Sequence, residues 1–124
     1  MTAWTSDELT KTDAADELEL ASIRRDGTLR GPVTIWVLRL GDDLFVRSVN
    51  GPAGAWFRGV QDRHEGRIRA GGVEKDVTFV DADHTLDDQI DTGYRTKYRR
   101  YSAGSVDHIT SPEARSTTIR LVPR

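Results

Sequence analysis

The residues best suited to bind a ligand lie in one stretch, which reads Arg-Ser-Val-Asn-Gly-Pro-Ala-Gly-Ala-Trp-Phe-Arg over residues 47–58. This pattern predicts the end of a strand, a glycine-rich loop through Gly51 and the start of a helix. A helix that begins after such a loop offers unpaired backbone N–H groups to an anion. Four side chains add hydrogen-bond donors: Arg47, Ser48, Asn50 and Arg58. The stretch is therefore a candidate anion-binding loop; the alternative is that it only turns the chain and the arginines face water.

Two further residues could extend this candidate site. Trp56 lies where the loop meets the helix, so it is better placed to stack on a ligand than Trp36, which is more typical of a core. Arg67 shares one face of a predicted strand with Arg69 and could continue the cationic surface. The alternative is that both strand arginines face water.

Tyrosines recur along a predicted helix over residues 85–101. Tyr94 and Tyr98 lie on one stripe with Leu86 and Ile90, so core packing is their default role. Phenol groups on a buried stripe need hydrogen-bond partners, however, and they could also line a pocket.

Several other kinds of site are not indicated. The chain has no cysteine, which excludes a disulfide framework, a Cys-based zinc site and a thiol nucleophile. The three histidines, His64, His84 and His108, are widely separated, so we expect no metal site. Six aspartates within residues 76–91 lack the pattern of a calcium loop and suit a solvated face. No motif supplies a nucleophile, so an enzyme of this sequence would need a bound cofactor.

Composition predicts a small protein without a membrane or nucleic-acid partner. The 124 residues are expected to form a single domain over residues 1–124. Charged residues make up 31% and the net charge is −2, which argues against a disordered acidic tail or a protein that coats nucleic acid. No apolar stretch approaches the roughly 18 residues of a membrane helix. The N-terminus also lacks the pattern of a secretion signal, so we expect a cytoplasmic protein.

About six strands and three helices are predicted. The strands are expected over residues 17–22, 32–40, 44–49, 67–70, 73–80 and 117–122. A first helix over residues 6–13, within an N-terminal capping segment 1–14, begins with a capping box of Thr5 and Glu8. A second helix runs from the glycine-rich loop to a C-cap at Gly66, and Thr85 caps the third. Because short turns join most strands, the sheet is expected to be antiparallel and to close into a small barrel.

The sequence motifs of the chain resemble those of a bacterial family known as domain-of-unknown-function 2255. The resemblance rests on residues 25–33, 35–37, 41–48, 56–58, 66–73, 94–98 and 119–123, so it covers nearly the whole chain.

The layout is also similar, more distantly, to the flavin and deazaflavin split-barrel oxidoreductases, including the deazaflavin-dependent nitroreductases. The matching positions are Arg30 and Pro32, Ser48 and Gly51, Trp56, Tyr94 and Tyr98, and Leu121 and Pro123. The chain departs from that pattern in having Val49-Asn50-Gly51 where two glycines usually follow the strand serine. It also has Arg58 near a position where asparagine is common.

This second resemblance implies an α+β fold, a six-stranded antiparallel split β-barrel of the FMN-binding type, and a homodimer. It implies FMN or a deazaflavin as cofactor, with the phosphate tail at Ser48, Asn50 and Gly51. The residues implied to neutralise its charge are Arg47, Arg58 and Arg67. Tyr94 or Tyr98 would position or protonate a small organic substrate during hydride transfer. The alternatives are a non-catalytic module for flavin, haem or another anionic metabolite, and a dimeric barrel with no ligand.

Overall fold

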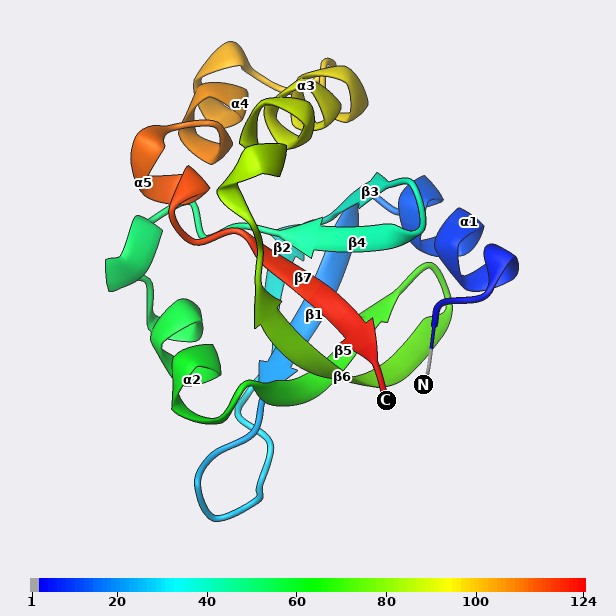
Figure 1. The fold of residues 1–124 in the computed structure, drawn as a ribbon, viewed down its shortest axis with the longest axis vertical. Helices are drawn as coiled ribbons and strands as arrows, with labels where there is room; N and C mark the ends of the chain where they lie inside the picture. The colour runs from blue at the N-terminus through cyan, green and yellow to red at the C-terminus, as the bar shows by residue number, and fades with distance from the viewer. Residues whose placement is uncertain (1–2) are drawn as a thin grey trace.

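A computed structural model describes residues 3–124, in which seven antiparallel strands form one sheet (Figure 1). The strands are β1 (Glu17–Ser22), β2 (Val33–Trp36), β3 (Leu38–Leu40), β4 (Asp43–Val46), β5 (Glu65–Ala70), β6 (Val73–Asp81) and β7 (Ile119–Pro123). Strands β5 and β6 flank the Gly71–Gly72 turn. Their pairing runs from Ala70 opposite Val73 to Glu65 opposite Thr78. The predicted β-hairpin at this turn is therefore confirmed.

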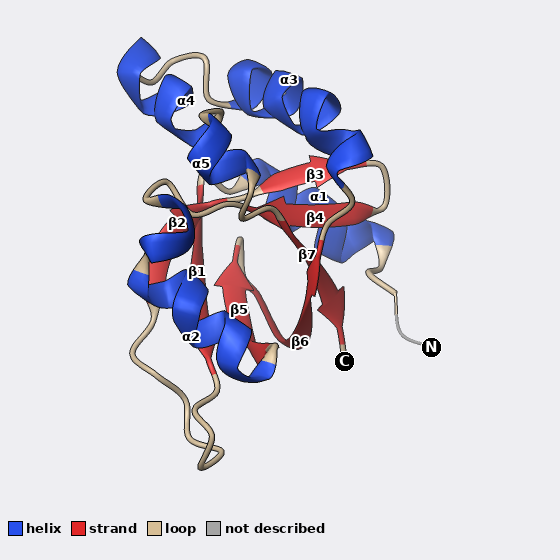
Figure 2. Cartoon of the chain, turned by 60° about the vertical axis from the view of Figure 1, so that its left-hand side comes forward, coloured by secondary structure: helices blue, strands red, loops and turns tan. Residues whose placement is uncertain are grey.

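The sheet wraps into a nearly closed barrel because its two ends belong to one stretch of chain. The strand order is β2-β1-β5-β6-β7-β4-β3, and only Val37 separates β2 from β3. The stretch 33–40 therefore leads from one end of the sheet to the other (Figure 2). This confirms the predicted α+β split β-barrel. Seven strands occupy the six predicted stretches because the strand expected over residues 32–40 bends at Val37.

The bend is stabilised by side chains from outside the sheet. The Tyr98 hydroxyl accepts the backbone N–H of Val37 at 3.0 Å and donates to the backbone oxygen of Asp16 at 2.6 Å. The ammonium group of Lys97 donates to the carbonyl oxygen of Val37 at 2.8 Å. Val37 is fully buried, so its backbone polar groups need such partners where strand pairing is interrupted.

Helices cover the barrel on three sides (Figure 1). They are α1 (Ser6–Ala14), α2 (Ala55–Arg63), α3 (Asp87–Lys97), α4 (Ala103–Ile109) and α5 (Pro112–Arg115), with short 3₁₀ helices η1 (Gly51–Ala53) and η2 (His84–Leu86). The predicted capping box at the start of α1 is present, with Thr5 and Glu8 bonded reciprocally. Nearby, the Trp4 indole donates to the backbone oxygen of Leu121 at 3.0 Å and ties the N-terminal segment to β7.

Two apolar clusters form the core. The larger fills the barrel and includes Leu18, Val46 and Phe79. The second lies between the barrel and the helices α3 and α4, where Phe45 packs with Tyr94. Among the described residues, no helix has both the length and the apolar character needed to cross a bilayer.

The helical predictions were wrong in four places. The predicted cap at Thr85 is absent, because Thr85 lies within η2 and α3 begins after Leu86 with no side-chain cap. The helix expected over residues 85–101 ends at Lys97, because Tyr98 leaves the helix to reach the bend at Val37. The C-cap of α2 is His64 in the left-handed conformation (φ 58°), while Gly66 belongs to β5. Residues 103–115, for which no helix was expected, form α4 and α5, each capped by a serine.

Candidate ligand-binding site

One cavity collects residues from the predicted anion-binding stretch. This pocket, called the ligand pocket below, has a volume of about 280 Å³ and lies among β2, the end of β4, α2 and α4. Its lining residues are Thr34, Ile35, Trp36, Arg47, Val49, Trp56, Ser105, His108 and Ile109. The walls are mainly apolar and aromatic, with a few polar groups, which is the usual make-up of a small-molecule site.

The stretch 47–58 has the predicted order of strand, loop and helix. The chain leaves β4 at Val46, turns at Gly51 (φ 67°), forms η1 and enters α2 after Gly54. No side chain caps the N-terminus of α2. The first backbone N–H groups of a helix have no partner within the helix, so they are available to an anion. Trp56 lies in this first turn and lines the pocket.

Arg47 is buried and already paired with the protein's own acidic groups. Its side chain has no exposed surface, and Nη1 donates to Asp91 Oδ1 at 2.5 Å and to the backbone oxygen of Ile109 at 3.1 Å. Nε donates to Thr118 Oγ1 at 2.8 Å. Nη2 lies 3.8 Å from Asp87 Oδ1. The sequence interpretation treated this guanidinium as free to neutralise a phosphate, whereas here the two aspartates neutralise it.

The same aspartates continue the network to α5. Arg115 Nε lies 3.2 Å from Asp91 Oδ2 and 3.9 Å from Asp87 Oδ2. Arg47 is therefore fixed between β4, α3 and α4, and its carboxylate partners are held in turn by α5. These contacts hold Arg47 in the wall of the ligand pocket, and removing one partner of such a buried pair would leave an uncompensated charge.

The other predicted residues of the loop do not line the pocket. Ser48 is buried, and its backbone N–H donates to Thr117 Oγ1 at 2.9 Å. Gly51 is also buried, and a side chain there would meet Glu113. Asn50 and Arg58 are exposed.

Tyr94 and Tyr98 belong to the core. Both are fully buried, and burial raises the pKa of each phenol. Tyr98 bonds the strand bend, and its ring stacks on Trp36 with the ring centres 4.0 Å apart. The Tyr94 hydroxyl has no hydrogen-bond partner, and the Arg47 guanidinium lies 5.6 Å from the centre of its ring. Their packing role fits the default interpretation, and neither hydroxyl is open to a ligand in this conformation.

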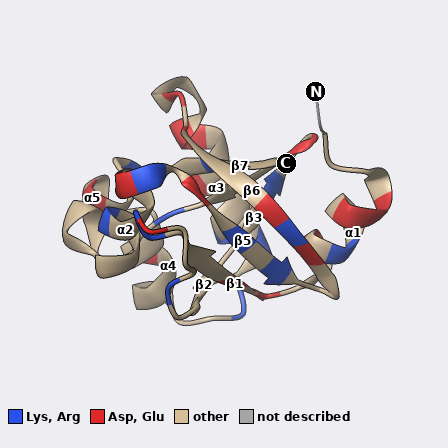
Figure 3. Cartoon of the chain, turned by 90° about the horizontal axis from the view of Figure 1, so that it is seen from below, with Lys and Arg blue, Asp and Glu red and all other residues tan. Residues whose placement is uncertain are grey.

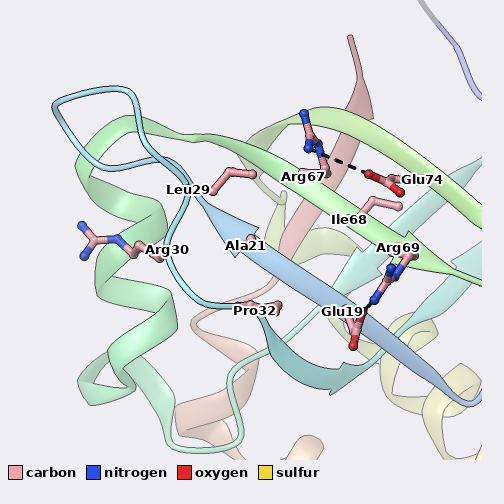
Figure 4. Close-up of a pocket in the computed structure, with 9 residues that line it drawn as sticks. All are labelled: Glu19, Ala21, Leu29, Arg30, Pro32, Arg67, Ile68, Arg69 and Glu74. Atoms are coloured by element: carbon pink, nitrogen blue, oxygen red, sulfur yellow. Dashed lines mark hydrogen bonds and ion pairs between the residues drawn. The ribbon is translucent and has the colours of Figure 1, made fainter.

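Arg67 lies in a different groove, between β1, β5 and the loop that follows β1 (Figure 4). Its Nε donates to Asp76 Oδ1 at 2.8 Å, and Nη1 lies 3.8 Å from Glu74. Figure 3 shows acidic and basic residues interleaved along β6 on this side of the barrel. The structure therefore does not bring Arg67 to the ligand pocket.

Sequence reasoning missed the α4 side of the pocket. Ser105, His108 and Ile109 come from a helix that was not predicted. Its start could have been found from Ser102, whose side chain accepts the Ser105 N–H. His108 was considered only as a metal ligand. Among residues 3–124, no three His, Asp or Glu side chains come close enough to hold a metal ion.

Solved structures with this fold differ widely in sequence from the chain. A conserved hypothetical protein from Mycobacterium tuberculosis has a TM-score of 0.68 at 12% identity, over 100% of this chain and 82% of that one. The heme storage protein HutZ from Vibrio cholerae has a TM-score of 0.68 at 13% identity, over 96% and 89%. An F420 reductase has a TM-score of 0.57 at 14% identity, over 93% and 90%. Likeness at this level of identity establishes the fold alone.

No curated protein matches the chain in sequence. A family model does match residues 8–121, which is nearly the whole chain. The family is described as an uncharacterized protein conserved in bacteria, and the resemblance seen in the sequence motifs is confirmed. This chain belongs to the DUF2255 family.

Proposed function

We propose that this chain binds FMN or a deazaflavin in the ligand pocket and acts as an oxidoreductase that transfers a hydride to a small organic substrate. The observation that carries the proposal is the pocket wall formed by two tryptophans beside the uncapped N-terminus of α2. Aromatic walls suit a planar ring system, and unpaired helix N–H groups suit a phosphate. The F420 reductase and this chain have the same fold, and F420 is a deazaflavin.

The chain's residues would divide the work of binding. Trp36 and Trp56 contact the ring and exclude water. The backbone N–H groups in the first turn of α2 hold the phosphate, because those of Ser48 and Gly51 are already bonded within the protein. The exposed side chains of Asn50 and Arg58 lie outside the pocket lining and add donors at the edge of the site. Arg47 holds the wall in place, since its charge is already shared with Asp91.

A flavin or deazaflavin, when bound, supplies the hydride chemistry. His108 is the pocket side chain suited to give or take a proton during the reaction, because an imidazole can act as an acid or a base. Orientation of the substrate and exclusion of water would be the protein's main contributions to rate.

We further propose that a second copy of the chain completes the site. Pockets that enclose a small-molecule ligand usually measure about 300–1,000 Å³, whereas this one measures about 280 Å³. The pocket of one chain is therefore at the lower limit of this range, and the second copy would extend its walls. Val49, at the pocket, has 47% of its surface exposed, which suits an apolar contact between the two copies.

A titration of the purified protein with FMN and with a deazaflavin, followed by absorbance and fluorescence, tests the proposal. We expect saturable binding, quenching of the cofactor fluorescence, and about five- to hundredfold weaker binding in Trp56→Leu, because loss of an aromatic contact costs about 1–3 kcal/mol. Phe57→Leu is the matched control: Phe57 is the neighbouring aromatic of α2, packs on the barrel core and does not line the pocket. Absence of binding by either cofactor, or equal loss in both variants, would reject the proposed site.

A binding function without turnover is the second candidate. His108 favours it, because an imidazole is a common axial ligand of haem iron, and HutZ has the same fold. Tighter binding of haem than of either flavin, lost in His108→Ala, would favour this candidate over the oxidoreductase.

A further inference from the structure

A second hollow, separate from the ligand pocket, lies between α1, β3 and the end of α3, which are neighbours in Figure 1. Its volume is about 550 Å³. The lining residues are Asp13, Leu38, Arg39, Gly93, Thr96, Lys97, Arg99 and Arg100. It shares no residue with the ligand pocket. We call it the basic hollow, because four of its eight residues carry positive charge.

Most cations of this protein have an acidic partner. In the described part of the chain, all but five of the 18 Lys and Arg side chains lie within 4.0 Å of a carboxylate oxygen. The five exceptions are Arg24, Arg39, Arg58, Lys97 and Arg99. Three of these five line the basic hollow. The groove that contains Arg67 differs, because there Arg67 and Arg69 are both matched by carboxylates.

The unpaired cations also have unused hydrogen-bond donors. An arginine carries five N–H donors. In Arg39 one bond is made, from Nε to the backbone oxygen of Gly41 at 2.8 Å. In Arg99 one is made, from Nη1 to the backbone oxygen of Thr96 at 3.2 Å. Lys97 uses one of its three donors on Val37. Most of the donor capacity around the hollow is therefore available to a ligand.

The charge of the hollow sets the charge of its ligand. Asp16 neutralises Arg100, and Asp13 is the single acidic residue that lines the hollow. Set against Arg39, Lys97 and Arg99, these leave a surplus of about two positive charges. Burial lowers the pKa of Lys97, and the negative charge of Asp13 opposes this shift only in part.

From these observations we infer that the basic hollow binds a small molecule through a doubly charged phosphate group. Guanidinium forks match phosphate oxygens in a bidentate way, and a tetrahedral dianion accepts bonds from several directions at once. The hollow is much larger than one phosphate, so it has room for the rest of a phosphorylated metabolite beside the apolar floor of Leu38 and Gly93. This inference does not depend on the proposed cofactor function.

Titration of the full chain with inorganic phosphate and with phenyl phosphate, at constant ionic strength and followed by NMR amide shifts, tests the inference. We expect saturable binding with a Kd of about 1 mM or tighter and shifts at residues 93–99. Arg39→Gln and Arg99→Gln should each weaken it about ten- to hundredfold, since a charge-assisted hydrogen bond is lost. Tighter binding of the ester than of inorganic phosphate would assign a phosphorylated metabolite, and equal binding would assign free phosphate.

Arg24→Gln is the control, because Arg24 also lacks a carboxylate partner but bonds Thr28 and Leu29 in the loop after β1. It should bind phosphate as the unmodified chain does. Equal weakening in the Arg24 variant would reduce the effect to net charge and overturn the inference. So would the absence of saturation, or shifts confined to residues 54–58, which would place the anion at α2. Thermal melting checks that each variant is folded.

Discussion

At the residue scale, the two predicted catalytic tyrosines are distinguished by their hydrogen bonds. Both share the buried stripe that their spacing predicted, yet only the Tyr98 hydroxyl has partners. Spacing along a helix reveals which face is buried, but it cannot reveal a bond to Val37, which lies 61 residues away in the chain. For the same reason, the sequence placed Arg47 in the candidate site but could not show that Asp91 already neutralises it.

This difference leads to opposite expectations for two conservative variants. Tyr98→Phe should lower the free energy of unfolding by about 1–3 kcal/mol, because it leaves the buried N–H of Val37 without a partner. Tyr94→Phe should leave the stability unchanged or raise it by up to about 1 kcal/mol, because it removes a buried hydroxyl that has no partner. Urea unfolding followed by tryptophan fluorescence measures both. Equal losses in the two variants would contradict the assignment of the bend to Tyr98.

At the scale of elements, the strands were more predictable than the helices. Alternating apolar residues and short turns such as Gly71–Gly72 are local signals, so they located the six strand stretches. The helices α4 and α5 are short, with seven and four residues, and they carry weak periodicity. Their serine caps were the available signal. Missing α4 removed His108 from the predicted site.

The pairing of β1 with β5 depends on a glycine that the sequence analysis assigned to a helix end. Gly66 pairs with Ser22 of β1, and a Cβ at this position would overlap the backbone oxygen of Ala21 and lie 2.8 Å from the Phe79 ring. Gly66→Ala should therefore lower the free energy of unfolding by about 1–3 kcal/mol or more.

Gly104→Ala is the matched control for this prediction. Gly104 lies in α4, and a Cβ at this position would have no neighbouring atom within 4 Å. Alanine should therefore be neutral or stabilise the protein by up to about 1 kcal/mol. Chemical denaturation of both variants under the same conditions is the measurement. If Gly66→Ala were as stable as Gly104→Ala, the close approach of β1 and β5 would be disproved.

At the scale of the whole molecule, the barrel places the stretch 47–58 beside β2, although β3 and β4 separate the two in the sequence. The ligand pocket is lined by β2, which is an end strand of the sheet and pairs with β1 on one side. Thr34 of this strand and Val49 of the loop are both exposed. The same face therefore carries the ligand pocket, an unpaired strand edge and an apolar side chain, which is why we propose that the second copy of the chain docks here.

Val49→Glu tests this arrangement, because a charge placed in an apolar contact opposes association. We expect the variant to shift the molecule from dimer to monomer in sedimentation equilibrium and to weaken cofactor binding in parallel. Leu29→Glu is the control, since Leu29 is similarly exposed, at 38% against 47%, but lies in the loop after β1, away from the ligand pocket. The proposal would be contradicted if the unmodified chain is monomeric, or if the Leu29 variant dissociates as readily as the Val49 variant. In either case the dimer would not form at the ligand pocket, and each chain would bind its ligand alone.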